Sequence, residues 1–196
     1  MTDTMTARTL LSGPLAWQRT DVVGTELVLA PGGGTAVVHG ALPYAMTWTA
    51  EVDDDAVVRE LSVTCRGGGW SRTLDLRRNA GGWTCHAAES GDAGLPAPGC
   101  ADPAAIPEDA VLRVTDSPVF VSWAVRRLAL TAESGPVTVP SARVLVPSLA
   151  VVPSATTYHL VSPKRLRVTG DGPATTYELD PSGVVAYQPG RLRLVR

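Results

Sequence analysis

The stretch SPVFVSWAVRRLAL, residues 117–130, decides what the interior of this protein is expected to contain. It is apolar over most of its length and rich in valine, as β-strands are, yet two adjacent arginines stand near its end. Side chains of a strand alternate between its two faces, so Arg126 and Arg127 would point in opposite directions. Both faces carry apolar neighbours. A strand here therefore predicts that at least one guanidinium group points into an apolar interior, and the sequence leaves open which one.

A guanidinium group in such a place needs a partner, because buried charges are as a rule paired. Removing one member of a buried ion pair typically costs about 3–5 kcal/mol. One interpretation is an internal ion pair, and another is a water-filled cavity in which the arginine holds an anionic or hydroxyl-rich head group. A β-bulge that turns both arginines outward is a third. The carboxylates considered for an internal pair are Glu26, Glu60, Asp102 and Asp116.

Turn sequences divide the rest of the chain into short segments. PGGG, DDD, RGGG, NAGG, GDAG, ESGP, TGDGP and DPSG recur roughly every 8 to 15 residues, as an all-β protein requires. Residues 44–52, 57–65 and 135–146 alternate between apolar and polar side chains or nearly so. We expect about a dozen or more strands, too many for a flat sheet that neither curls nor splits. The best helical candidate is a single turn within residues 102–110.

Length and composition favour one globular β domain over residues 15–196, with a flexible tail over residues 1–14. The chain has 196 residues, of which 44% are hydrophobic. Residues 93–110 are predicted to be a crossover loop, with a two-lobe organisation as a possibility. The net charge of −2 argues against a nucleic-acid partner. The oligomeric state stays open.

The sequence also predicts a cytoplasmic location. No run of eighteen apolar residues is present, so no membrane span is expected. The first residues include Asp3 and lack the apolar stretch of a signal peptide. Three cysteines, an odd number, favour free thiols in a reducing compartment.

Catalytic and metal-binding machinery is hard to assemble from these residues. Cys85 and His86 are neighbours, so on a strand they face opposite ways. A cysteine nucleophile would be Cys100, with Asp102 nearby and a histidine brought in by the fold. The cysteines and His86 lack zinc-site spacing, so no metal and no cofactor is expected. The candidate histidines are His39, His86 and His159.

Tryptophan is over-used, with five tryptophans against one phenylalanine. Core packing is the simplest role for any one of them. As a group they also fit a concave sheet whose indoles contact sugar rings or acyl chains. The five are Trp17, Trp48, Trp70, Trp83 and Trp123.

Several motifs together resemble a known family. In chain order they are Trp17, GTE at 24–26, RELSV at 59–63, GGW at 81–83, GCAD at 99–102 and the stretch quoted first. This order is similar to that of the bacterial glycolipid-binding family, formerly a domain of unknown function, from about Leu15 to Arg193. Ser122, Trp123 and Ala124 depart from its pattern, whereas both arginines and Leu128 are kept. The resemblance implies a large curved, mostly antiparallel sheet, an open or incomplete barrel with little or no helix, like the half-barrels of lipoprotein carriers.

The sequence thus predicts a non-enzymatic binding or carrier protein for a small amphipathic molecule, a glycolipid or other lipid, held in an apolar trough. The alternatives are a hydrolase or transferase that acts on a lipid or sugar conjugate through Cys100, Asp102 or a histidine, and a structural or interaction module with a packed core. Arginines and an acidic residue would hold the polar end, and indoles would contact the apolar or sugar face. The expected binding residues are Glu26, Arg59, Arg126 and Arg127 for the first role and Trp17, Trp48, Trp70 and Trp123 for the second.

Overall fold

The structure, a computed structural model, describes residues 13–29 and 32–195, so most of the expected tail lies outside the described residues. Over these ranges it contains fourteen strands in one sheet, one α-helix and one short 3-10 helix. The elements are β1 (Leu15–Arg19), β2 (Val23–Leu29), β3 (Gly33–His39), β4 (Tyr44–Val52), β5 (Val58–Gly67), β6 (Trp70–Asn79), β7 (Gly82–Ser90), η1 (Pro103–Ala105), β8 (Val111–Val114), α1 (Pro118–Arg127), β9 (Pro136–Leu145), β10 (Ala150–Ser162), β11 (Arg165–Thr169), β12 (Thr175–Leu179), β13 (Val185–Gln188) and β14 (Leu192–Val195).

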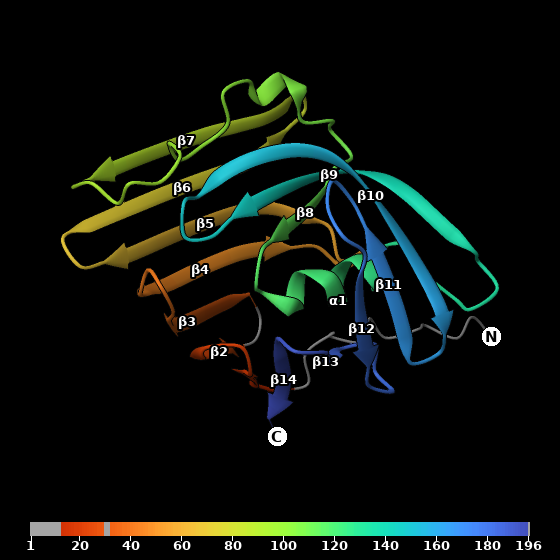
Figure 1. The fold of residues 1–196 in the computed structure, drawn as a ribbon. Coiled ribbons are helices and arrows are strands. Elements are labelled where there is room, and N and C mark those ends of the chain that lie inside the picture. Colours follow the sequence, from red (N-terminus) through yellow and green to blue (C-terminus); the bar gives the residue numbers. More distant parts are fainter. Residues whose placement is uncertain (1–12, 30–31, 196) are drawn as a thin grey trace.

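The sheet is a pair of meanders joined through the two ends of the chain. Its strand order is β7-β6-β5-β4-β3-β2-β1-β14-β13-β12-β11-β10-β9-β8, and β1 therefore lies between β2 and β14. Neighbouring strands are antiparallel except β8 and β9, which are parallel. The sheet curls around α1, and its outer strands β7 and β8 do not pair with each other within the described residues (Figure 1). The prediction of an open, mostly antiparallel curved sheet with little helix is confirmed.

The segment between β7 and β8 connects the two ends of this sheet. The Gly99 N–H donates to the Leu149 carbonyl oxygen at 2.9 Å, and the Gly99 carbonyl accepts from the Val151 N–H at 2.8 Å. Arg72 of β6 is buried and donates to the Ser148 carbonyl oxygen at 2.9 Å. Its guanidinium group also bonds two carbonyls of the segment itself, those of Leu95 and Pro96. The segment and Arg72 therefore hold together strands that the sheet leaves unpaired. The predicted single turn within residues 102–110 is η1.

The prediction of a strand over residues 117–130 is wrong, because this stretch forms α1. The helix lies on the concave side of the sheet (Figure 1), and all its residues from Pro118 to Val125 are buried. A helix enclosed on every side shows no polar face, so its apolar run cannot be told from a buried strand by periodicity. The local signals were a serine and a proline at the start and two arginines in the last turn, all typical of helix ends.

Aromatic packing and one buried hydrogen bond fix α1 in place. Phe120 and Trp123 pack against Trp48 of β4, with ring centroids 5.1 Å and 5.9 Å from that indole and 5.0 Å from each other. On the opposite side of the sheet's curve, the Val185 N–H of β13 donates to the Ser122 hydroxyl at 3.0 Å. The core thus lies between α1 and the concave face. With ten residues, α1 is too short to cross a membrane, and no other part of the described chain forms a helix that could.

Candidate ligand-binding site

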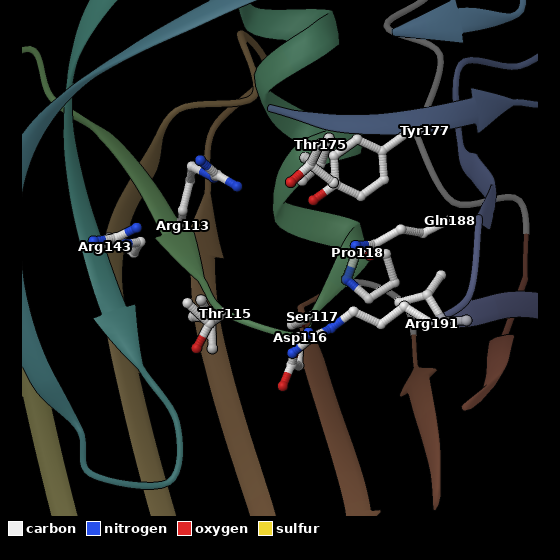
Figure 2. A pocket seen from close by; sticks show the side chains of 13 residues that line it. Arg113, Thr115, Asp116, Ser117, Pro118, Arg143, Thr175, Tyr177, Gln188 and Arg191 are labelled. Carbon is white, nitrogen blue, oxygen red and sulfur yellow. The ribbon is translucent and has the colours of Figure 1, made fainter. Parts of the chain in front are cut away.

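A polar pocket of about 270 Å³ lies beside the first turn of α1. We call it the arginine pocket and define it by Arg113, Asp116, Arg143, Tyr177, Gln188 and Arg191. Figure 2 shows Arg113 and Arg143 on one side, from β8 and β9, and Tyr177, Gln188 and Arg191 on the other. The curl of the sheet is what brings these strands to face each other, because β8 and β14 are far apart in the strand order.

Two arginines of this pocket are neighbours in the only parallel ladder of the described sheet. Arg113 of β8 is the register partner of Arg143 of β9. Paired residues point to the same face of a sheet, and both side chains line the pocket. Like charges in directly opposed positions destabilise a strand pair. A negative charge between the two arginines would offset this repulsion.

The described residues supply little negative charge next to Arg113 and Arg143. The Tyr177 hydroxyl, a neutral group, hydrogen-bonds Arg113. None of the ion pairs within the described residues includes Arg113. Arg143 lies 3.9 Å from a carboxylate oxygen of Asp171, whose side chain is 55% exposed, and such pairs contribute little. The Arg143 Nε is buried and has no hydrogen-bond partner in the described chain.

Asp116 is the acidic residue of the pocket, but other arginines already neutralise it. Arg191 donates to one Asp116 oxygen through Nε at 2.9 Å and Nη2 at 2.5 Å. Arg19 Nη1 lies 3.0 Å from the other oxygen, and Arg19 also pairs with Asp21 at 2.6 Å. One carboxylate thus faces two guanidinium groups, which leaves the pocket positive overall.

The start of α1 adds to this positive character. Ser117 is the N-cap residue, yet its hydroxyl donates to Glu26 Oε1 at 2.5 Å and accepts no N–H of the first turn. Ser117 and Pro118 both line the pocket. The first N–H groups of a helix and its dipole favour an anion nearby. Burial raises the pKa of Tyr177, so its phenol stays protonated and can donate a hydrogen bond.

Several of the residues that we predicted from the sequence gather near this turn rather than in the pocket. Glu26 is buried, and its Oε1 accepts from the Trp48 indole at 3.0 Å and from Ser117. Its other oxygen has no partner among the described residues. Burial raises the pKa of Glu26 to about 7, and the nearby Asp116 adds to the rise. Glu26 therefore anchors the N-cap of α1 to β2.

The tryptophans lie in the core. Trp17 donates to the Val185 carbonyl oxygen at 2.7 Å and, with Glu26, lines a small cavity. Trp48 and Trp123 belong to the aromatic cluster around Phe120. Trp70 is buried away from this cluster, and its indole covers Gly67, where a Cβ would come within 2.3 Å of the ring.

Arg126 and Arg127, the arginines at the end of α1, contact backbone oxygens of neighbouring loops. Arg126 Nη2 lies 3.5 Å from the Asp54 carbonyl oxygen. Arg127 donates to the carbonyl oxygens of Ala110, at 3.0 Å, and Asp109, at 2.5 Å. Both arginines therefore join the end of α1 to neighbouring loops through backbone oxygens. Arg59 forms a half-exposed pair with Asp53 at 2.6 Å, next to the Asp54 carbonyl that Arg126 contacts. Neither Arg59 nor the two helical arginines line the arginine pocket.

The sequence did contain a signal for the residues that define the pocket. Arg113 stands in the apolar stretch VLRV and Arg143 in SARVLV, as Glu26 stands in TELVL. A charged residue within an apolar strand is the signal that indicated Glu26, and the same signal indicates these two arginines. The pairing of Arg113 with Arg143 could not be predicted, because the register of strands thirty residues apart follows from the fold and not from local sequence.

The residues proposed for catalysis do not form a nucleophile and base pair. The Cys100 thiol donates to the Asp102 carbonyl oxygen at 3.3 Å, and no histidine of the described chain hydrogen-bonds it. All three cysteines are free thiols. The described residues hold no group of three or more His, Cys, Asp or Glu side chains arranged for a metal ion.

Comparison with known proteins identifies the family. No curated protein matches the chain. The crystal structure of a DUF1089-family protein from Pseudomonas aeruginosa superposes with a TM-score of 0.62 over 97% of this chain and 96% of that one. At 18% identity this likeness shows a shared fold. A protein-family model described as "Putative glycolipid-binding" matches residues 14–193, and the chain therefore belongs to this family.

Proposed function

We propose that the protein is a non-enzymatic binding or carrier protein for an amphipathic ligand of the glycolipid kind, whose polar end enters the arginine pocket. The observation that carries the proposal is the set of three guanidinium groups in one pocket, of which Arg113 has no carboxylate partner among the described residues. Family membership supports the ligand class.

The size of the pocket limits which part of the ligand it takes. Its volume of about 270 Å³ is near the lower end of ligand pockets, which span about 300–1,000 Å³. A head group fits this space, but a head group together with an acyl chain does not. The acyl tail therefore stays outside the pocket. This placement differs from the apolar trough expected from the sequence, since α1 and its aromatic neighbours fill the concave side.

The two rival functions each predict something that the site lacks. A structural module with a fully packed core would pair every interior arginine with a carboxylate, and Arg113 departs from that pattern within the described residues. An enzyme built on Cys100 would place a base at the thiol, and the thiol instead contacts a backbone carbonyl. A binding protein accounts for both observations.

Mass spectrometry of the purified protein tests the proposal. We expect a lipid to copurify with the wild type, visible in native spectra and after solvent extraction, and to be depleted in Arg143→Gln. Arg193→Gln is the matched control, because Arg193 is exposed and follows the pocket residue Leu192 on β14, with its side chain on the other face. No copurifying lipid, together with an unchanged melting temperature on adding glycolipids, contradicts the proposal.

A further inference from the structure

We infer that the polar end of the ligand carries an oxyanion, a phosphate, sulfate or carboxylate, held between Arg113 and Arg143. This inference rests on the ligand-binding function proposed above and narrows its ligand class. A neutral sugar would satisfy hydrogen-bond donors in the pocket, but it would leave the repulsion between two adjacent cations in place.

The geometry of the ladder suits one anion between two guanidinium groups. Neighbouring strands lie about 4.8 Å apart, so side chains in register on one face can flank a single small group. A guanidinium group presents N–H donors in a planar fork that matches the oxygens of carboxylate and phosphate. Arg143 lines the pocket, and its buried Nε has no hydrogen-bond partner among the described residues.

The other side of the pocket favours an anion as well. The carboxylate of Asp116 is held by Arg191 and Arg19, so it does not need to be displaced. The first turn of α1 presents its positive end at Ser117 and Pro118. Gln188 and the protonated Tyr177 supply neutral polar groups for hydroxyls next to the anion.

Calorimetric titration with three probes tests the charge of the head group. The probes are inorganic phosphate, dihexanoyl phosphatidic acid and octyl glucoside, the amphiphiles below their micelle concentrations, in a low-salt buffer free of phosphate and sulfate. We expect phosphatidic acid to bind at least about tenfold more tightly than octyl glucoside, as charge-assisted hydrogen bonds imply. Inorganic phosphate is expected to bind more weakly than phosphatidic acid and to compete with it.

Variants distinguish binding in the arginine pocket from general electrostatic attraction between the anionic lipid and the protein surface. Arg113→Gln and Arg143→Gln should each weaken phosphatidic acid by about ten- to hundredfold, because charged hydrogen bonds are the strong ones. Arg193→Gln removes the same charge on the other face of β14 and should change binding less than about twofold. In anion-free buffer Arg113→Gln should melt no lower than the wild type, since it relieves a repulsion. A clearly lower melting temperature would mean that Arg113 has a structural role instead.

The outcomes distinguish this inference from the proposed function. Equal binding of octyl glucoside and phosphatidic acid, unaffected by either pocket variant, overturns the inference and leaves the carrier function standing. Binding of inorganic phosphate as tight as that of phosphatidic acid supports an anion site and contradicts the carrier function. Absence of binding by all three probes contradicts both.

Discussion

Glu26 carries a carboxyl group that the fold removes from water. One oxygen accepts hydrogen bonds from Trp48 and Ser117, and the other has no partner among the described residues. Burial is the main cause that disfavours the charged form of Glu26, and the nearby Asp116 adds to it. Arg19 favours the charged form, but its effect is smaller than that of burial. The pKa of about 7 therefore follows from desolvation. The residue holds the start of α1, so its charge state bears on the stability of the whole interior.

We predict that Glu26 makes the protein more stable in mild acid. Its pKa is about 4.5 unfolded and about 7 folded, so the folded state binds more protons between these values. Stability should therefore fall as pH rises from about 4.5 to 7, by up to about 3 kcal/mol in the free energy of unfolding. Glu26→Gln keeps the acceptor oxygen without the charge and should remove this difference. Urea unfolding at pH 5, 6, 7 and 8 measures it.

The control for this measurement is Glu51→Gln, since Glu51 is exposed on β4. That variant should keep the pH dependence of the wild type. If Glu26→Gln kept it as well, another group would be responsible for the effect, and Glu26 would not be the buried acid that the fold isolates.

At the scale of elements, α1 is the part of the fold that contradicts the strand pattern. Its valines favour a strand by propensity, and only burial on every side makes a helix acceptable there. The helix brings Ser122 to β13, where the Val185 N–H donates to its hydroxyl. That bond ties the helix to the half of the sheet that bears Tyr177 and Arg191. The position of α1 thus sets one wall of the arginine pocket.

We predict that Ser122→Ala destabilises the protein by about 1–3 kcal/mol, because it leaves the buried Val185 N–H without a partner. Thr73→Ala, at an exposed position of β6, should change stability by less than about 0.5 kcal/mol. Thermal or urea unfolding of the three proteins gives the comparison. Equal stability of Ser122→Ala and the wild type would mean that this bond does not hold the helix.

The periodicity of apolar residues explains both why most strands were predicted from the sequence and why the helix was not. Residues 44–52, 57–65 and 135–146 were expected as strands and correspond to β4, β5 and β9. Their alternation reflects one buried and one exposed face, which is a local property. Residues 117–130 lie where neither strand nor helix would have an exposed face. Periodicity then carries no information, and only Ser117 and Pro118 at the start and the two arginines at the end indicated a helix.

At the scale of the whole molecule, the fold depends on contacts that local sequence cannot predict. The two ends of the sheet are joined by the segment around Gly99 and by Arg72, not by a strand ladder. The pocket depends in turn on the curl that these contacts hold and on the parallel register of Arg113 and Arg143. The sequence therefore contained a signal for Arg113 and Arg143, whereas the assembly of the pocket could not be predicted from it.

We predict that Gly99→Ala weakens this closure more than Gly94→Ala does. Both glycines have positive φ, of 89° and 61°, so alanine costs about 1–2 kcal/mol at either position. At Gly99 the added Cβ would also lie 2.9 Å from the Ala87 side chain, whereas at Gly94 nothing lies within 4 Å. Gly99→Ala should melt several degrees lower and exchange the Val151 amide hydrogen faster. Equal losses in the two variants would show that the segment adjusts freely.

The place of β1 in the sheet has a consequence for synthesis. One of its edges pairs with β2, which follows at once, but the other pairs with β14, near residue 195. At about 5–20 residues per second, translation leaves that second edge without its partner for on the order of ten seconds or more. Unpaired strand edges recruit foreign strands. Nascent chains of this protein should therefore need protection by a chaperone until β14 has left the ribosome.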